Sequence, residues 1–520
     1  MRERGGRCRR PSRGGRPSDP GRRGPARGRL LCAALTALAV AAAGGLGACG
    51  KPIRHQVGPQ PRPNVLVIET DDQTVRSMPV MTHVRELLAE HGVTFDNSFV
   101  SLPQCCPSRA TFLTGQYAHN HHVLSNSPPS GGFQKLDSRN TLAVWLQRAG
   151  YYTTLVGKYL NGYGQRNPRE VPPGWSEWLA DTEATTYSYF DYTLNHDGRL
   201  VHVGKSDSDY KTDYLGRAAT RIIRARAPSS RPFFMWVAFT APHRGSSDRG
   251  EGDESGPKNA VPAPEDEGKF DDLPVPQPPS FNEADVSDKP RAVRNLPPFS
   301  ERRLERVKQR FRLQQESLLA VDRAVESIVD ALDETGDLKH TVIVYTSDNG
   351  FFNGDHRFPS GKLLAYEPSI RVPLIVRGPG VPEGQHRGQL VANIDLAPTI
   401  VALAGAHPGR VMDGLSLLPL ARNPSREPAR ALLLESGPEA SRQGIPPFTG
   451  IRSPHHVYVE YSDGERELYD LRRDPWELQN AASNPAYRSI RSALARWLRD
   501  LRHCRGGSCR AGPPPGSPPL

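Results

Sequence analysis

Short apolar runs alternate with amphipathic stretches over most of the chain. The apolar runs occupy residues 65–68, 152–156, 233–239, 341–345 and 374–376, and they predict buried strands. Stretches with helical character lie between them, at residues 81–91, 142–149, 213–227 and 302–332. This alternation of strands and helices along the chain predicts an α/β domain built on a doubly wound sheet.

The pattern changes after about residue 422. Short strands are predicted at residues 430–434, 456–461 and 465–471, with a hairpin turn at 462–464, and a helix follows at 487–501. Such a run of strands predicts a small antiparallel sheet with a packed helix. We therefore place the α/β domain at residues 64–422 and an α+β part at 423–510. The Pro/Gly-rich segment 511–520 is predicted to be a disordered tail.

A long segment rich in Pro, Asp, Glu and Ser interrupts the α/β pattern at residues 244–300. Its composition predicts a surface insertion that is at best partly ordered. It directly follows His243, a candidate site residue, so we expect it to shape the entrance of a pocket.

The chain has 520 residues and a formal net charge of +11. Its first 29 residues hold eleven arginines against Glu3 and Asp19, so most of the net charge belongs to this segment. The rest of the chain is close to neutral, and the basic balance is therefore no argument for a nucleic-acid partner.

An apolar run at residues 30–43 follows the arginine-rich segment and is too short to span a bilayer comfortably. Residues 46–49, Leu-Gly-Ala-Cys, resemble a bacterial lipobox. This predicts a lipoprotein signal peptide at 1–48, a lipid on Cys49 and a tether at 49–63. The protein would then be exported and anchored to the outside of the cell membrane; a plain secretory signal, and hence a secreted protein, is the alternative.

The chain contains seven cysteines. In an exported protein, Cys504 and Cys509, five positions apart, are expected to form a small local disulfide. Cys105 and Cys106 begin the segment Cys-Cys-Pro-Ser-Arg. Pro107 suits the first turn of a helix and Gly115 the position just past its end. Cys105 would then lie at a helix N-terminus, which favours anions, and Arg109 would lie on the same face one turn on. A buried thiol pair or a vicinal disulfide is the alternative.

Polar residues follow two of the predicted strands. Asp71 and Asp72 come after the first, and Asp348 and Asn349 come after the strand at 341–345. Ligands bind beyond the carboxyl ends of strands in such sheets. These oxygen donors suit Ca²⁺, with Mg²⁺ as the alternative.

The segment Cys-X-Pro-Ser-Arg resembles the signature of the formylglycine-dependent sulfatases of the alkaline phosphatase superfamily. The resemblance implies a large mixed or parallel sheet sandwiched by helices. It also implies that a formylglycine-generating enzyme oxidises Cys105 to formylglycine (3-oxoalanine), whose hydrate attacks sulfur. Asp71, Asp72, Asp348 and Asn349 would hold the divalent cation, and residue 105 would complete its coordination.

Further motifs extend the resemblance. Residues 150–159 match the second signature of the family, which implies that Lys158 contacts formylglycine and sulfate. His243, in Ala-Pro-His, and Lys362 match residues near the bridging oxygen, and Arg109 would neutralise sulfuryl charge. His356 is a weaker candidate for substrate contact. One departure is Leu160, where many sulfatases have histidine.

Within the family, the chain resembles most the N-acetylglucosamine-6-sulfatases, in His-Asn-His-His at 119–122 and in residues 391–396 and 412–419. This implies a sulfated sugar as substrate and a role in glycosaminoglycan degradation. One alternative is a phosphodiesterase or phosphonate monoester hydrolase of the same superfamily. Another is an inactive cell-surface lipoprotein that binds sulfated glycans and keeps Cys105 as a thiol.

Overall fold

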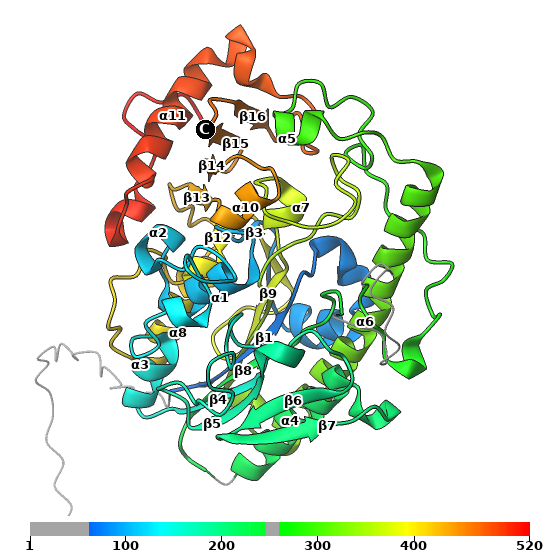
Figure 1. Ribbon diagram of the computed structural model, residues 1–520. Coiled ribbons are helices and arrows are strands. Elements are labelled where there is room, and N and C mark those ends of the chain that lie inside the picture. Colours follow the sequence, from blue (N-terminus) through cyan, green and yellow to red (C-terminus); the bar gives the residue numbers. More distant parts are fainter. Residues whose placement is uncertain (1–61, 228, 246–258) are drawn as a thin grey trace, which may run out of the picture. The chain divides into compact units, whose positions relative to one another are not determined.

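The centre of the fold is a ten-stranded mixed sheet with the strand order β11-β2-β10-β9-β1-β8-β4-β5-β6-β7 (Figure 1). The computed structural model describes residues 62–227, 229–245 and 259–520. The predicted signal peptide, Cys49 and nearly all of the tether lie outside these residues. Residues Pro61–Leu520 form one compact unit. In sheet order, the strands are Gln385–Arg387, Gly92–Phe95, Leu374–Arg377, Thr341–Ser347, Asn64–Thr70, Phe233–Ala238, Tyr152–Gly157, Glu177–Asp181, Tyr192–His196 and Arg199–Val203.

The five central strands β9, β1, β8, β4 and β5 run parallel, and antiparallel pairs flank them at β10 and at β6–β7. The sheet is therefore mixed, as the family resemblance implies. All five strands predicted from apolar runs are confirmed. Strands β5, β6 and β7 were not predicted, because polar residues interrupt their sequences.

Helices cover both faces of the sheet (Figure 1). Successive side chains of a strand point to opposite faces. Accordingly, Val65 and Val67 of β1 belong to one buried cluster with α1 (Cys105–Thr114), α3 (Leu142–Arg148) and α8 (Leu396–Ala404). Leu66 and Ile68 belong to a second cluster with α4 (Lys211–Arg226) and α6 (Glu301–Glu334). The predicted sandwich of helices around a sheet is confirmed.

The C-terminal part contains a four-stranded antiparallel sheet, covered by α11 (Arg488–Leu501). Its strands are β13 (Leu432–Glu435), β14 (Phe448–Arg452), β15 (His456–Tyr461) and β16 (Arg466–Asp470). The sequence did not predict β14, because Gly450 and two preceding prolines interrupt its pattern. This sheet shares a buried cluster with Phe99 and Leu364. The predicted boundary near residue 422 therefore separates two sheets within one compact unit.

Most of the described part of the predicted insertion, residues 259–300, packs onto the body of the protein. Ala260, Ala263 and Val293 are buried. The helix α5 (Arg291–Arg294) donates hydrogen bonds to Glu465, beside the small sheet, from the Arg291 backbone N–H (2.8 Å) and from Arg294 (3.1 Å). Apolar residues scattered between prolines and acidic residues thus order more of this segment than its composition predicted.

The segment 511–520, predicted to be a disordered tail, contacts the rest of the protein at both of its ends. The Trp497 indole donates a hydrogen bond to the Ala511 carbonyl (3.2 Å), and Leu520 packs partly buried against the C-terminal cluster. One indole and one apolar side chain give this Pro-rich segment the contacts that its composition does not reveal. Just before it, a disulfide joins Cys504 and Cys509, the pair predicted from the spacing.

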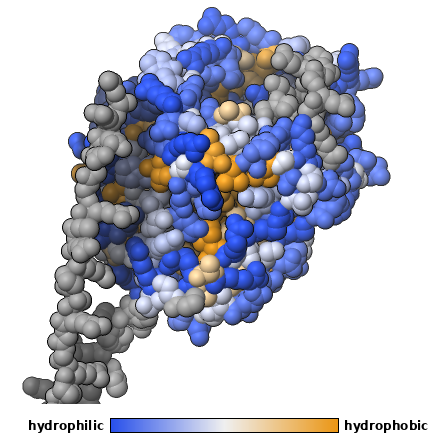
Figure 2. Space-filling model, turned by 60° about the horizontal axis from the view of Figure 1, so that its bottom comes forward, coloured by the Kyte–Doolittle hydropathy of each residue, from blue (hydrophilic) through white to orange (hydrophobic). Residues whose placement is uncertain are grey.

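The remaining elements are short. They are β3 (Ser98–Phe99), β12 (Val391–Ala392), α2 (Ala118–His121), α7 (Glu367–Ile370), α9 (Leu418–Arg422), α10 (Pro438–Arg442), η1 (Val75–Val80), η2 (Val84–Ala89), η3 (Phe133–Lys135), η4 (Glu183–Thr185), η5 (Asp207–Asp209), η6 (Pro264–Asp266), η7 (Leu338–His340), η8 (Asn393–Asp395), η9 (Ala481–Ser483), η10 (Pro485–Tyr487) and η11 (Gly506–Arg510). Among the described residues, no helix is both long and apolar enough to cross a bilayer. Figure 2 shows a largely hydrophilic face with apolar residues gathered in a central strip.

Candidate active site

Four neighbouring parallel strands bring the predicted site residues together. Asp71 and Asp72 follow β1, Asp348 and Asn349 follow β9, His243 follows β8 and Lys158 follows β4. Since β1 pairs with both β8 and β9, and β8 pairs with β4, their carboxyl ends meet at one edge of the sheet. The strand ends therefore bring together the residues that the sequence placed there.

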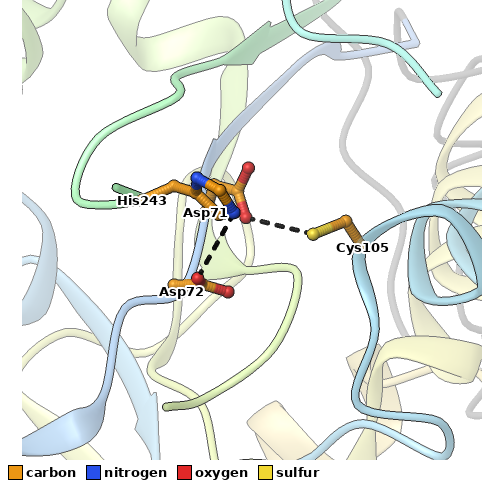
Figure 3. A group of neighbouring side chains, drawn as sticks. All are labelled: Asp71, Asp72, Cys105 and His243. Atoms are coloured by element: carbon orange, nitrogen blue, oxygen red, sulfur yellow. Dashed lines mark hydrogen bonds and ion pairs between the residues drawn. The ribbon is translucent and has the colours of Figure 1, made fainter. Parts of the chain in front are cut away.

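Cys105 approaches this edge from the first position of α1 (Figure 3). The preceding Gln104 is extended, and Gly115 ends the helix in the left-handed conformation, with φ 65°, as predicted. The Cys105 Sγ lies 3.4 Å from Asp71 Oδ1 and 2.9 Å from Lys362 Nζ. Cys106 is also a free thiol and points into the core cluster around α1, so the two cysteines do not form a vicinal disulfide.

The Cys105 side chain is only 1% exposed. Burial, reinforced by the negative charge of Asp71, raises the pKa of the thiol to about 12. The unmodified side chain is therefore a protonated thiol at neutral pH, and a thiol is a poor nucleophile. This environment does not support thiolate catalysis.

Three buried carboxylates and three cationic side chains surround Cys105. Lys158 pairs with Asp71, and Lys362 pairs with Asp72. Arg109 donates from Nε to Asp348 Oδ2 (2.8 Å) and from Nη1 to the Lys158 carbonyl (2.9 Å). Burial opposes ionisation of Asp71, but attraction by Lys158 holds the pKa of this carboxyl at about 2.

The donor set fits a hard divalent cation. Ligand atoms of Asp71, Asp72, Cys105 and His243 all lie within 4.8 Å of one another. The Lys362 ammonium contacts Asp72, Cys105 and, at 3.1 Å, Asn349 Oδ1. A positive group thus already lies among three predicted ligands, and carboxylate and amide oxygens are the donors that such cations prefer.

The other predicted ligands adjoin this group. Asp348 Oδ1 accepts from the Asp72 backbone N–H (3.3 Å), and Asn349 Nδ2 donates to Asp72 Oδ1 (2.6 Å). His243 was predicted beside the substrate. Its Nε2 lies 3.7 Å from Asp72 Oδ2 (Figure 3), while its Nδ1 donates to the Arg244 carbonyl (2.8 Å). Burial lowers the pKa of His243, which favours a neutral ring with a free lone pair at Nε2.

A cavity of about 730 Å³ opens onto Cys105, Asp72, His243 and Lys362. Its remaining wall is largely polar. Arg244, Gly245 and Ala260 of the insertion contribute to it, as expected for the pocket entrance. Glu439 of α10 and Gln443, just after this helix, also line it. A larger cavity, of about 1260 Å³ between α4 and α6, contains none of the predicted site residues.

Sequence reasoning missed two residues of the site. Glu69 Oε2 lies 3.4 Å from Arg109 Nη1 and accepts a hydrogen bond from the Trp236 indole (3.0 Å). Glu69 could have been recognised from the sequence, because its carboxylate lies two residues before Asp71. Tyr187 stacks on His243, with ring centroids 4.2 Å apart, but it lies in a loop with no pattern that marks it.

His356 does not line the cavity above Cys105. It is buried, its Nδ1 pairs with Glu283 (2.6 Å), and its ring stacks on Tyr366. It lines a second cavity, described below.

Comparison with known proteins agrees with this geometry. The family model described as Sulfatase matches residues 63–406, and the model described as N-sulphoglucosamine sulphohydrolase, C-terminal, matches residues 354–504. The N-acetylglucosamine-6-sulfatase of Homo sapiens is 34% identical over 493 residues, which cover 86% of each chain. The extracellular sulfatase SULF-1 homolog of Drosophila melanogaster is 34% identical over 368 residues, covering 69% of this chain and 31% of that relative.

Solved structures share the fold. A protein in complex with its substrate D-glucosamine-2-N,6-O-disulfate superimposes with a TM-score of 0.72 at 24% identity, covering 85% of this chain and 97% of the other. The phosphonate monoester hydrolase of Agrobacterium radiobacter superimposes with a TM-score of 0.64 at 25% identity, covering 85% of this chain and 95% of the other. The match of the family model over residues 63–406, the relatives and the site around Cys105 together show that this chain belongs to the sulfatase family, whose members hydrolyse sulfate esters.

Proposed function

We propose that this sulfatase removes a sulfate ester from a sugar, with N-acetylglucosamine 6-sulfate as the preferred unit, and takes part in the breakdown of sulfated glycosaminoglycans. The observation that carries the reaction is the position of Cys105, at a helix N-terminus and in contact with Asp71 and Lys362. The substrate is supported by the relative named N-acetylglucosamine-6-sulfatase.

The proposed nucleophile is the hydrated aldehyde made from Cys105 by a formylglycine-generating enzyme. A Ca²⁺ ion, with Mg²⁺ as the alternative, would be held by Asp71, Asp72, Asp348 and Asn349 together with residue 105. When bound, this cation would polarise the S–O bond and favour ionisation of the aldehyde hydrate.

Arg109 and Lys158 are proposed to neutralise the charge on the sulfuryl oxygens. Both are buried, so their attraction to an anion is little screened by solvent. Arg109 Nη2 has no hydrogen-bond partner among the described residues and so keeps an unused donor.

Lys362 and His243 are proposed to act at the bridging oxygen. Lys362 carries protons and contacts Cys105, so it can stabilise the departing alkoxide. Alternatively, His243 in its protonated form would give its Nε2 proton to the departing alcohol. His356 has no proposed role in this step.

Mass spectrometry of the peptide that contains residues 105–109 tests the nucleophile, and turnover of N-acetylglucosamine 6-sulfate and of an aryl sulfate tests the reaction. We expect an aldehyde at position 105 and loss of both activities in Cys105→Ala. Full activity in Cys105→Ala would refute the mechanism. An unmodified thiol in an inactive protein would instead favour a binder of sulfated glycans.

A phosphodiesterase or phosphonate monoester hydrolase is the second candidate, favoured by the fold shared with the Agrobacterium enzyme. Comparison of kcat/KM for an aryl sulfate and the matched aryl phosphodiester separates the two. We expect the sulfate to be preferred, and preference for the diester would reverse the assignment.

Export is also proposed. It is supported by the relative named an extracellular sulfatase and by the lipobox-like residues 46–49. If Cys49 carries a lipid, Cys49→Ala moves the protein from the membrane fraction to the soluble fraction. Equal partition of the variant and the wild type would argue for a plain secretory signal.

A further inference from the structure

A second cavity, of about 220 Å³, lies beside the active-site cavity. The two share Phe351 as a wall. On α6, Phe311 lines the second cavity, whereas its neighbour Arg310 lines the first. At about 220 Å³, it is smaller than typical pockets for drug-sized ligands, which suits one small ring.

The floor of this cavity contains polar atoms without partners. Asn353 Oδ1, His356 Nε2 and Glu477 Oε1 have no hydrogen-bond partner among the described residues, and all three residues line the cavity. Their exposed fractions are 8%, 1% and 1%. An unsatisfied buried polar group costs about 1–3 kcal/mol, so three such groups on residues that line one cavity point to a polar ligand.

Neighbouring contacts hold these side chains in place. His356 Nδ1 donates to Glu283 Oε2 (2.6 Å), which holds the ring in place and leaves Nε2 without a partner among the described residues. Glu477 Oε2 accepts from the Glu367 backbone N–H (2.9 Å), which leaves Oε1 free. The floor is thus fixed before any ligand arrives, as binding sites require.

The mouth of the cavity is apolar. Among the described residues, the exposed large hydrophobic side chains include Trp476 (39% exposed) and Val75 (38%), and both line this cavity. Arg76 lies over the Trp476 ring, 5.8 Å from its centroid, and pairs with Asp355 (2.8 Å). An exposed indole above a polar floor matches a sugar ring, which combines an apolar C–H face with hydroxyl groups along its edge.

We propose that this cavity is a second carbohydrate subsite, in which Trp476 stacks on the sugar unit next to the sulfated one while Asn353, His356 and Glu477 bind its polar substituents. The proposal rests on the proposed function, since the first cavity must hold a sulfated sugar. It gives His356 a place one sugar away from the reacting ester. It also makes the enzyme selective for oligosaccharides over single sugars.

The test compares kcat/KM for a sulfated tetrasaccharide with kcat/KM for the sulfated monosaccharide. We expect Trp476→Ala to lower this ratio about ten-fold, the scale of an aromatic contact with the area it buries, chiefly through KM. Trp476→Phe keeps an aromatic ring and should restore most of the ratio. Val171→Ala, an exposed apolar side chain outside both cavities, is the matched control and should keep the wild-type ratio.

Binding to Cys105→Ala protein separates this proposal from the proposed function. Isothermal titration with the tetrasaccharide should show about ten-fold weaker binding when Trp476→Ala is added to that background. Equal tetrasaccharide affinity with and without Trp476, or an unchanged kcat/KM ratio, overturns the subsite. Failure of the wild type to cleave any sulfate ester would refute the proposed function instead, and the titration would still decide whether the cavity binds carbohydrate.

Discussion

Replacing Arg109 by lysine tests whether the geometry of this side chain, and not its charge alone, supports the site. Arg109 is fully buried. It donates to Asp348 (2.8 Å) and to the Lys158 carbonyl (2.9 Å), and its Nη1 lies 3.4 Å from Glu69. A lysine keeps the positive charge but has one nitrogen, so it cannot maintain these three contacts at once.

The magnitude follows from the contacts that are lost. Hydrogen bonds to charged groups contribute about 1.5–3 kcal/mol each, and Arg109→Lys loses at least one while Asp348 stays buried. We therefore expect the free energy of unfolding to fall by about 3 kcal/mol. At about 2.1 cal/mol/K per residue, unfolding of the compact unit has an entropy of about 1 kcal/mol/K, so Tm should fall by about 3 °C. Loss of a positioned donor beside the nucleophile should lower kcat about 100-fold or more.

The assay pairs thermal unfolding with turnover of an aryl sulfate. Arg221→Lys, on the exposed face of α4, controls for the substitution itself and should match the wild type in both measurements. A variant at Arg109 that keeps its Tm within 1 °C and its kcat within three-fold would show that charge alone suffices, which would refute the geometric reasoning.

Three further predictions concern the cation, pH and the C-terminus. Removal of divalent cations by chelation should abolish sulfate ester hydrolysis, and added Ca²⁺ should restore it and raise Tm by mass action; activity that survives chelation would exclude the metal role. Burial lowers the pKa of His121 to about 3 from an ordinary 6.5, and its Nδ1 accepts from the Val123 N–H (3.1 Å). Between about pH 3 and pH 6.5, the unfolded chain therefore binds a proton at His121 that the folded chain does not bind. The free energy of unfolding should fall by up to about 1.4 kcal/mol per pH unit as the pH drops below 6.5. Urea denaturation at several pH values should show a weaker pH dependence of this free energy in His121→Asn. Deletion of residues 511–520 should lower Tm, because it removes the Ala511 carbonyl bound by Trp497 and the contact of Leu520; an unchanged Tm would mean that the tail does not contribute to stability.

Much of the site could be predicted because its residues directly follow strands that are recognisable in the sequence. Asp71 and Asp348 are far apart in sequence, yet each follows an uninterrupted apolar strand, and parallel strands bring such ends to one edge. Gly115 and Pro107 marked the limits of α1 in the same way. Tyr187 could not be found, since its role depends on a loop that folds back over His243.

The fold shows the same division between regular and irregular segments. Continuous apolar runs marked the central strands β9, β1, β8 and β4, because these strands are buried on both faces. The strands β5, β6 and β7 carry polar residues between their apolar ones, and β14 contains Gly450, so their patterns were too weak to recognise. The insertion packs through a few alanines and valines that its polar composition conceals. Which face of the protein such a segment covers is decided by tertiary contacts, which no local pattern records.

The central position of β1 has a consequence for biosynthesis. Its partner strands lie far along the chain, and Asn64 pairs with Thr341. At about 5–20 residues per second, a ribosome needs roughly 15–55 s to produce that partner after β1 has emerged. Until then β1 has no neighbour on that side, the edge that receives α1 is incomplete, and Cys105 is not yet enclosed. The nascent chain thus offers a modifying enzyme an interval of access to a side chain that the finished fold buries almost completely.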